Sequence, residues 1–167
     1  MRPTRNALSW LTVSAVVIAL DQLTKAIAMH LLEPEMPHAV IPGFLNWTLA
    51  FNTGAAFSFL ADQEGWQRWL FTLLAVAISA VLVRWLAKTP RSDWRSALPL
   101  ALVIGGAIGN LIDRLRAGHV TDFIQVYHGQ WAFPSFNLAD SAISVGATLL
   151  IVFGLFWRGS HESAGRT

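Results

Sequence analysis

Residues 66–86 read WQRWLFTLLAVAISAVLVRWL, an apolar run interrupted by one arginine near each end. Crossing the hydrocarbon core of a bilayer takes about 20 helical residues, and a run of this length and composition is typical of a membrane-spanning helix. Three further stretches have the same character and lie at about residues 7–28, 96–115 and 138–157. The sequence therefore predicts an α-helical membrane protein with four transmembrane helices.

The composition of the whole chain supports this prediction. Of its 167 residues, 54% are hydrophobic and 13% are charged, and the mean hydropathy is +0.47. In a soluble domain about a quarter of the residues are charged, roughly twice the fraction found here, so this chain has too much apolar surface for water. The formal net charge is only +2 and no basic cluster stands out, which argues against a nucleic-acid partner. The absence of Cys excludes thiolate metal sites and a cysteine nucleophile.

The distribution of Lys and Arg predicts the orientation of the helices. Eight of the twelve basic residues lie at the N-terminus, between the second and third spans, or in the C-terminal tail: Arg2, Arg5, Arg84, Lys88, Arg91, Arg95, Arg158 and Arg166. Because basic residues are enriched on the cytoplasmic side, we expect both termini in the cytoplasm. The longer connections, at about residues 29–65 and 116–137, then face outward, and residues 1–167 form a single integral membrane domain.

The two outward connections carry strand-like sequence. Residues 40–59 read VIPGFLNWTLAFNTGAAFSF, which is apolar, aromatic and partly alternating. In the second connection, Val120, Ile124 and Val126 share one parity with Asp122, as expected for a short strand. We therefore expect a small extracytoplasmic β cradle that lies on the outer membrane surface.

Four of the ten acidic residues lie at the outward ends of the spans or just beyond them, namely Asp21, Asp113, Asp122 and Asp140. An Asp at the middle of a bilayer costs about 2.5–3.5 kcal/mol, so each acidic residue near a span needs a reason. Polar residues that gather at one depth from three different spans indicate one shared site.

Some of these residues have a purely structural explanation. Asp21 and Lys25 have the i,i+4 spacing of a helical ion pair. Asn110 shares a helix face with both Asp113 and Arg114, which favours a polar network between the third and first spans. A structural network is therefore the simplest interpretation of this group.

The remaining carboxylates allow two interpretations. Asn137, three residues before Asp140, has the pattern of a helix N-cap with a carboxylate in the first turn. Asp122 has no local partner and is either a solvated loop residue or part of the shared site. The GxxxG spacing at residues 105–109 indicates close helix packing, since no soluble strand precedes it as a dinucleotide site would require.

Asp122 and Asp140 are the simplest chemical pair in the chain. Two carboxylates within hydrogen-bond reach share one proton, and such a dyad can activate water while it protonates a carbonyl oxygen or a leaving amine. This is aspartic peptidase chemistry, which needs no metal or cofactor. A small transporter or channel and a structural membrane scaffold are the competing classes. Four spans without an inverted repeat argue against the transporter, and the clustering at one depth argues against the scaffold.

Five sequence blocks resemble the signatures of the lipoprotein signal peptidase family, also called signal peptidase II. They lie in the family's order at residues 21–25 (DQLTK), 52–57 (NTGAAF), 105–114 (GGAIGNLIDR), 120–123 (VTDF) and 136–140 (FNLAD). The resemblance implies a monomeric aspartic endopeptidase of the bacterial inner membrane with its active site at the periplasmic face. It implies removal of signal peptides from prolipoproteins just before a diacylglyceryl-modified cysteine, with membrane lipids as further partners.

The resemblance also implies roles for individual residues. It makes Asp122 and Asp140 the catalytic dyad. It assigns substrate-binding or site-supporting roles to ten more residues, namely Asp21, Lys25, Asn52, Gly54, Gly106, Asn110, Arg114, Phe136, Asn137 and Ala139.

Overall fold

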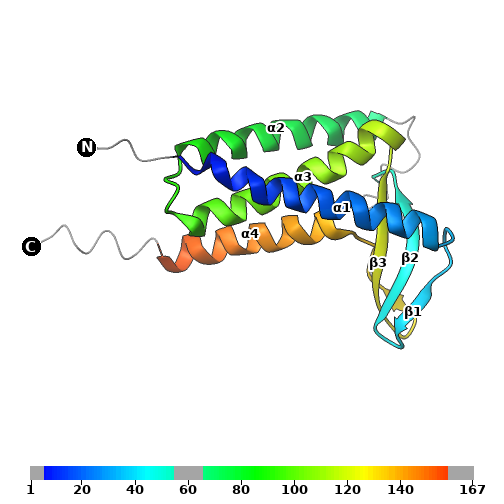
Figure 1. The fold of residues 1–167 in the computed structure, drawn as a ribbon. Helices are drawn as coiled ribbons and strands as arrows, with labels where there is room; N and C mark the ends of the chain where they lie inside the picture. Colours follow the sequence, from blue (N-terminus) through cyan, green and yellow to red (C-terminus); the bar gives the residue numbers. More distant parts are fainter. Residues whose placement is uncertain (1–5, 55–65, 158–167) are drawn as a thin grey trace, which may run out of the picture.

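The computed structural model describes residues 6–54 and 66–157 (Figure 1). The elements in chain order are η1 (Ala7–Trp10), α1 (Leu11–Leu31), β1 (His38–Ile41), β2 (Leu45–Asn52), α2 (Trp66–Lys88), α3 (Trp94–Ala117), β3 (Val120–His128), β4 (Trp131–Ala132) and α4 (Leu138–Trp157). All four long helices have the length and apolar composition needed to cross a membrane, which confirms the four expected spans. Residues 55–59 of the expected strand-like stretch lie outside the described residues.

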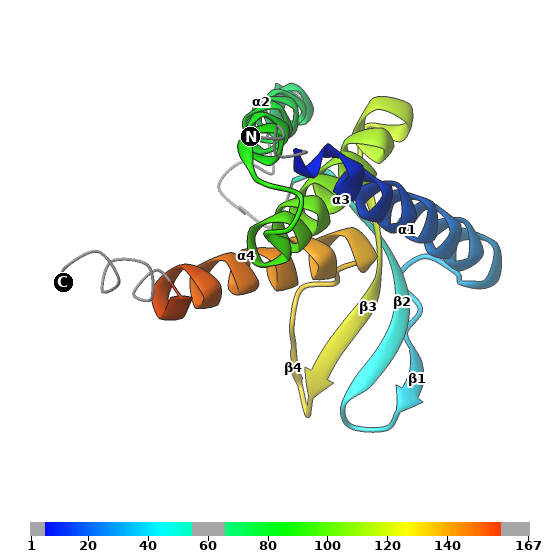
Figure 2. The ribbon, with the colours of Figure 1, turned by 60° about the vertical axis from the view of Figure 1, so that its left-hand side comes forward.

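Helix α3 lies at the centre of the bundle and packs against the other three helices (Figure 2). Its apolar window is 61% buried, whereas that of α2 is 11% buried. The small residues of the GxxxG stretch allow this packing: a Cβ added at Gly105 would lie 2.8 Å from the Val17 side chain of α1. One added at Gly106 would collide with the carbonyl oxygen of Ala139 on α4. The expected close helix packing is confirmed.

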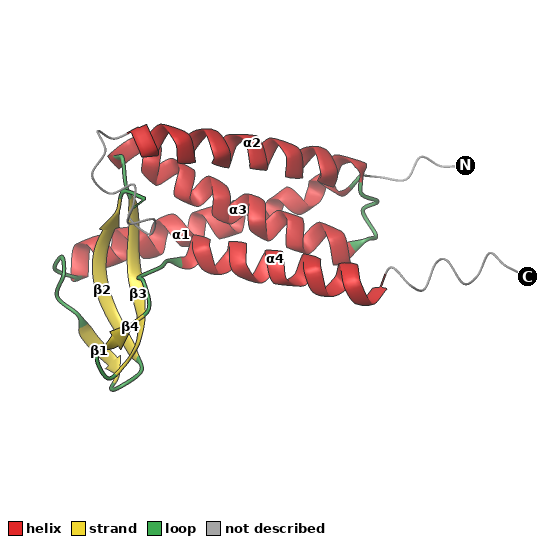
Figure 3. Cartoon of the chain, turned by 180° about the vertical axis from the view of Figure 1, so that it is seen from behind, coloured by secondary structure: helices red, strands yellow, loops and turns green. Residues whose placement is uncertain are grey.

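The four strands form one antiparallel sheet in the order β1-β2-β3-β4. The sheet lies at one end of the bundle, and its strands run across the direction of the helices (Figure 3). Residues directly opposite each other in an antiparallel pair share a face. Because Ala50 pairs with Asp122 and Asn52 pairs with Val120, the end of β2 lies beside Asp122.

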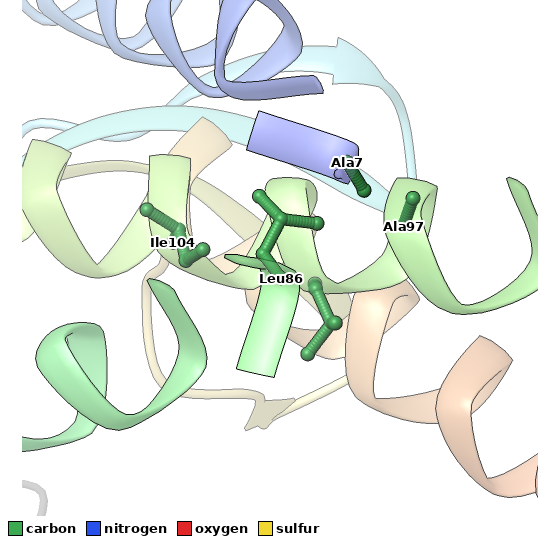
Figure 4. Packing of buried hydrophobic residues seen from close by; sticks show 5 residues of the cluster. Ala7, Leu86, Ala97 and Ile104 are labelled. Atoms are coloured by element: carbon green, nitrogen blue, oxygen red, sulfur yellow. The ribbon is translucent and has the colours of Figure 1, made fainter. Parts of the chain in front are cut away.

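The apolar core of buried residues lies toward the opposite end of the bundle. It contains Ala7, Leu86, Ala97, Leu100 and Ile104, and Figure 4 shows how η1, α2 and α3 contribute to it. The Ala7 amide donates to the Thr89 carbonyl at 2.9 Å, so η1 is tied to the connection between α2 and α3. Apolar packing and these contacts therefore stabilise one end of the bundle, and most of the buried polar residues lie toward the other end.

Candidate active site

Asp122 lies on β3 and is only 2% exposed, so the interpretation as a solvated loop residue is wrong. Its Oδ1 accepts a hydrogen bond from Asn137 Nδ2 at 2.7 Å, and its Oδ2 accepts one from Asn52 Nδ2 at 3.2 Å. Asn52 is the last residue of β2, and the antiparallel register brings it to this position. Both carboxylate oxygens therefore have amide donors, and no Lys or Arg of the described residues forms an ion pair with them.

Asp140 lies in the first turn of α4, where the helix begins with a reciprocal cap. The Asp140 amide donates to Asn137 Oδ1 at 2.9 Å, and the Asn137 amide donates to Asp140 Oδ2 at 3.2 Å. This is a capping box, and it confirms the expected N-cap. Asp140 Oδ1 accepts a hydrogen bond of 2.7 Å from Asn110 Nδ2, and the carboxylate lies at the N-terminal end of α4.

Asn137 connects the two carboxylates, because its side-chain amide donates to Asp122 Oδ1 and its backbone amide donates to Asp140 Oδ2. It is fully buried, and its amide nitrogen faces Asp122 while its amide oxygen faces the Asp140 backbone. Among the described residues, no hydrogen bond joins Asp122 directly to Asp140. The pair is therefore held at a fixed spacing by the side-chain and backbone amides of one residue rather than by a carboxylate–carboxylate contact.

The surroundings of Asp122 favour its protonated form. Burial, followed by the nearby charge of Asp140, raises the pKa of Asp122 to about 7. The hydrogen bonds from Asn52 and Asn137 and the charge of Lys25 act in the opposite direction but do not cancel the effect. Near neutral pH this carboxyl group is poised between holding and releasing a proton.

Lys25 forms the centre of a second polar cluster beside the first. Its Nζ lies 2.8 Å from Asp21 Oδ2 and 2.9 Å from Asp113 Oδ2, and it donates to Asn110 Oδ1 at 2.9 Å. Its side chain is 2% exposed, so all three ammonium donors are used inside the protein. The expected ion pair with Asp21 and the expected network between α1 and α3 are both present.

The Lys25 cluster also holds the backbone on either side of the candidate dyad. Asp21 Oδ1 accepts from the Ala139 amide at 3.0 Å, and Asp113 Oδ2 accepts from the Thr121 amide at 3.1 Å. Each amide belongs to the residue that precedes one of the two candidate catalytic aspartates. The cluster therefore fixes where β3 and α4 present their carboxylates.

Arg114 lies one helical turn after Asn110 on α3, and it is partly buried. Its Nη1 donates to the Asn110 carbonyl at 3.4 Å, and its Cζ lies 5.3 Å from the centroid of the Phe71 ring on α2. The guanidinium interacts electrostatically with Asp140 and Asp122. It is the group at the site best suited to hold carbonyl oxygens of a bound peptide.

The other expected site residues shape the backbone. Gly54 has a φ of +108°, which favours glycine, and its amide donates to Asn52 Oδ1 at 2.8 Å. Phe136 exchanges two backbone hydrogen bonds of 2.9 Å with Ile124 of β3. Because Gly106 has no side chain, the Ala139 backbone in the first turn of α4 can pack directly against α3. These contacts bring the end of β2 and the start of α4 toward Asp122.

Sequence reasoning missed three contributors to this arrangement. Gln22 donates to Asp113 Oδ1 at 2.9 Å and to Asp21 Oδ2 at 3.2 Å, and its polar side chain inside a span was a usable signal. Thr121 contributes through its backbone amide, which its residue type cannot reveal. Phe71 lies in an apolar run where nothing distinguishes it from a lipid-facing residue. Asp113, expected in the structural network, also contacts the backbone of β3.

The described residues contain no group of three or more His, Asp or Glu side chains placed to hold a metal ion.

Comparisons with known proteins identify the family of the chain. Residues 13–156 match the family model described as "Signal peptidase (SPase) II". A protein named "Lipoprotein signal peptidase" from Xanthomonas campestris pv. campestris (strain 8004) is 61% identical over 164 residues, 98% of each chain. One of the same name from Xylella fastidiosa (strain M12) is 58% identical over 156 residues, 93% of each chain.

The fold has a solved counterpart as well. A bacterial membrane enzyme crystallised by the in meso method matches with a TM-score of 0.78 and 31% sequence identity. The match covers 89% of this chain and 93% of that one. Because the family model covers residues 13–156 and the relatives match over almost their whole length, the chain belongs to the signal peptidase II family.

Proposed function

We propose that this chain removes signal peptides from bacterial prolipoproteins, cutting just before a diacylglyceryl-modified cysteine, and that Asp122 and Asp140 carry out the hydrolysis. As a member of the signal peptidase II family the chain is a peptidase. The observation that carries the aspartic mechanism is the bridge through Asn137, which holds two carboxylates from β3 and α4 side by side.

The two carboxylates have different tasks in this mechanism. Asp122, with a pKa of about 7, holds the proton at rest. Asp140, at a helix N-terminus with two hydrogen-bond donors, is ionised and takes a proton from the attacking water. Asp122 gives its proton to the scissile carbonyl oxygen as the tetrahedral intermediate forms. Collapse of that intermediate breaks the C–N bond. The proton held by Asp140 passes to the leaving amine, and a hydroxyl proton of the intermediate returns to Asp122 as the carboxylic acid product forms.

The remaining polar residues bind and orient the peptide. Arg114 and the side chain of Asn52 lie beside the dyad, where their N–H groups can donate to backbone carbonyl oxygens. The Lys25 cluster keeps the two catalytic backbones in place and does not touch the substrate. No metal or cofactor is required by this division of tasks.

The end of the bundle that carries the sheet faces the periplasm, and both termini lie in the cytoplasm. The connection between α2 and α3 lies at the end opposite the sheet (Figure 1). Four basic residues lie in this connection or in the adjoining ends of the two helices, namely Arg84, Lys88, Arg91 and Arg95, as expected for the cytoplasmic side. Val40, Ile41, Phe44 and Trp47 of the sheet and its turn are 45–54% exposed, which suits contact with membrane lipids. The chain acts as a single membrane domain and as a monomer.

Cleavage of a defined substrate tests the function. The purified protein should convert a prolipoprotein with a diacylglyceryl cysteine into a shortened lipoprotein, detected as a mass loss equal to the signal peptide. The same prolipoprotein without its lipid is the matched control and should stay intact. A transporter or scaffold would leave both substrates uncut, and that result would refute the proposal.

Cysteine labelling tests the orientation, because the chain has no Cys of its own. Ala39→Cys on β1 should react with a membrane-impermeant thiol reagent added outside the inner membrane. Arg91→Cys, in the exposed connection between α2 and α3, should react only after the membrane is opened. The reverse pattern would overturn the orientation without affecting the peptidase assignment.

A further inference from the structure

The guanidinium of Arg114 lies beside the candidate dyad without being paired to it. In the described part of the chain, the ion pairs are those of Lys25, and no carboxylate lies within 4.0 Å of Arg114. Its hydrogen bond to the Asn110 carbonyl, at 3.4 Å, is too long to fix its direction strongly. Its orientation must therefore depend on another contact.

The ring of Phe71 provides that contact. The distance of 5.3 Å from Arg114 Cζ to the ring centroid is within the range of about 6 Å for a cation–π interaction. A carboxylate would occupy the N–H donors of a guanidinium in a forked pair. An aromatic face holds the flat side of the group instead and leaves those donors free for oxygen atoms of a ligand.

The Phe71 ring also packs against the end of the strand that supports Asp122. A Cβ added at Gly54 would lie 2.7 Å from Phe71 Cε2, so the ring approaches the backbone as closely as a glycine allows. The Gly54 amide donates to Asn52 Oδ1, and Asn52 Nδ2 donates to Asp122 Oδ2. Phe71 thus contacts two parts of the site at once, although α2 contributes none of the expected site residues.

We infer that Phe71 is a positioning residue for substrate binding: its ring holds the Arg114 guanidinium so that the N–H donors face the carbonyl oxygens of the bound peptide. The inference rests on the proposed function, because it gives Arg114 a peptide to hold. A Phe that only fills space would be replaced by another apolar side chain at little cost to binding. A Phe that acts through its π face can be replaced only by another aromatic residue.

The test compares Phe71→Leu with Phe71→Tyr on a lipidated prolipoprotein. Loss of a partly buried cation–π interaction predicts about a tenfold fall in kcat/KM for the Leu variant, mainly through KM. The Tyr variant should stay close to the wild type. Trp69→Leu is the matched control, since Trp69 lies on the same helix and is 62% exposed. Its ring centroid lies 5.2 Å from Cζ of Arg68, whereas the Phe71 ring contacts Arg114. It should cleave normally.

A double-mutant cycle with Arg114→Gln identifies the residue through which Phe71 acts. If Phe71 works through Arg114, adding Phe71→Leu to the Gln variant should cause no further loss. Additive losses, or equal losses in the Leu and Tyr variants, would show that Phe71 acts by packing alone and would overturn the inference. Should Phe71→Leu fail to fold, Phe71→Met, which fills a similar volume without a ring, takes its place in the cycle.

Cleavage by the wild type and by Trp69→Leu shows whether a negative result concerns the role of Phe71 or the proposed function itself. If neither cleaves the lipidated prolipoprotein, the proposed function fails and the inference falls with it. If both cleave it and Phe71→Leu cleaves it with an unchanged KM, only the role of Phe71 is refuted.

Discussion

Two pairs of aspartates lie close together in this fold, and they differ in what joins them. Asp21 and Asp113 share an ammonium group, with Lys25 Nζ at 2.8 Å from one and 2.9 Å from the other. Asp122 and Asp140 share an amide, the side chain and backbone of Asn137. The residue type is the same in both pairs, so the joining group determines what each pair can do.

A cation between two carboxylates offsets part of their negative charge and leaves their remaining lone pairs for backbone amides. Asp21 and Asp113 use theirs to bind the amides of Ala139 and Thr121. An amide between two carboxylates fixes their positions but supplies no charge. Burial and the nearby charge of Asp140 then raise the pKa of Asp122 to about 7. One pair is therefore suited to support and the other to proton transfer.

Replacing either member of the amide-joined pair should have the largest effect. Asp122→Asn or Asp140→Asn removes a proton donor or acceptor from the reaction, so cleavage of a lipidated prolipoprotein should fall by at least about a hundredfold. Both variants should still unfold cooperatively in detergent. Asp93→Asn, which keeps an N-cap at the far end of α3, is the matched control and should cleave normally. Near-normal cleavage by a dyad variant would remove that Asp from the mechanism.

Removing the cation from the other pair should mainly affect stability. Lys25→Met leaves two buried carboxylates without compensation, and breaking a buried ion pair in this way costs about 3–5 kcal/mol of the free energy of unfolding. Denaturant titration in mixed micelles measures the loss. Lys88→Met, at the exposed end of α2, should change the same quantity by about 0.5 kcal/mol or less. A Lys25→Met protein as stable as the wild type would show that the Lys25 cluster is not a support.

Much of this arrangement could be predicted from the sequence, because its signals are local. The four spans follow from apolar length, the Asp21–Lys25 pair from i,i+4 spacing, and the α4 cap from Asn137 three residues before Asp140. Each pattern depends on residues within one helix or one turn. The physical rule that connects pattern to structure is therefore short-ranged.

What could not be predicted depends on contacts between distant segments. That Asp21 binds the Ala139 amide, 118 positions away, depends on how α1 and α4 pack around α3. The contact of Phe71 with Arg114 depends in the same way on the rotation of α2 about its axis. An apolar run gives no signal for that rotation, since lipid-facing and site-facing aromatic residues look alike in sequence.

The pH dependence of the rate should show how the amide-joined pair shares its proton. Its two apparent pKa values belong to the pair, and the active form holds one proton. Because the pKa of Asp122 is about 7, kcat should fall above that pH by about tenfold per pH unit as the last proton is lost. It should fall again in acid, when both carboxylates are protonated. A kcat that is flat across this range in nanodiscs, with chemistry rate-limiting, would exclude the shared proton.

The raised pKa of Asp122 should also affect how the stability of the wild type depends on pH. An Asp has a pKa of about 3.9 in an unfolded chain, whereas that of Asp122 in the folded protein is about 7. Between these values the folded state holds a proton that the unfolded state has lost, so stability falls by up to about 1.4 kcal/mol per pH unit as the pH rises from 4 to 7.

The Asn side chain of Asp122→Asn cannot titrate, so the variant should lack this decline. The free energy of unfolding of the variant should therefore rise relative to that of the wild type as the pH increases toward 7. Carboxylates remote from the dyad titrate in both proteins, and taking the difference removes their contribution. Asp93→Asn should show no such shift through the same range. If the Asp122→Asn difference also stays constant with pH, burial does not hold a proton on Asp122. The contrast between a compensated and an uncompensated aspartate pair would then be lost.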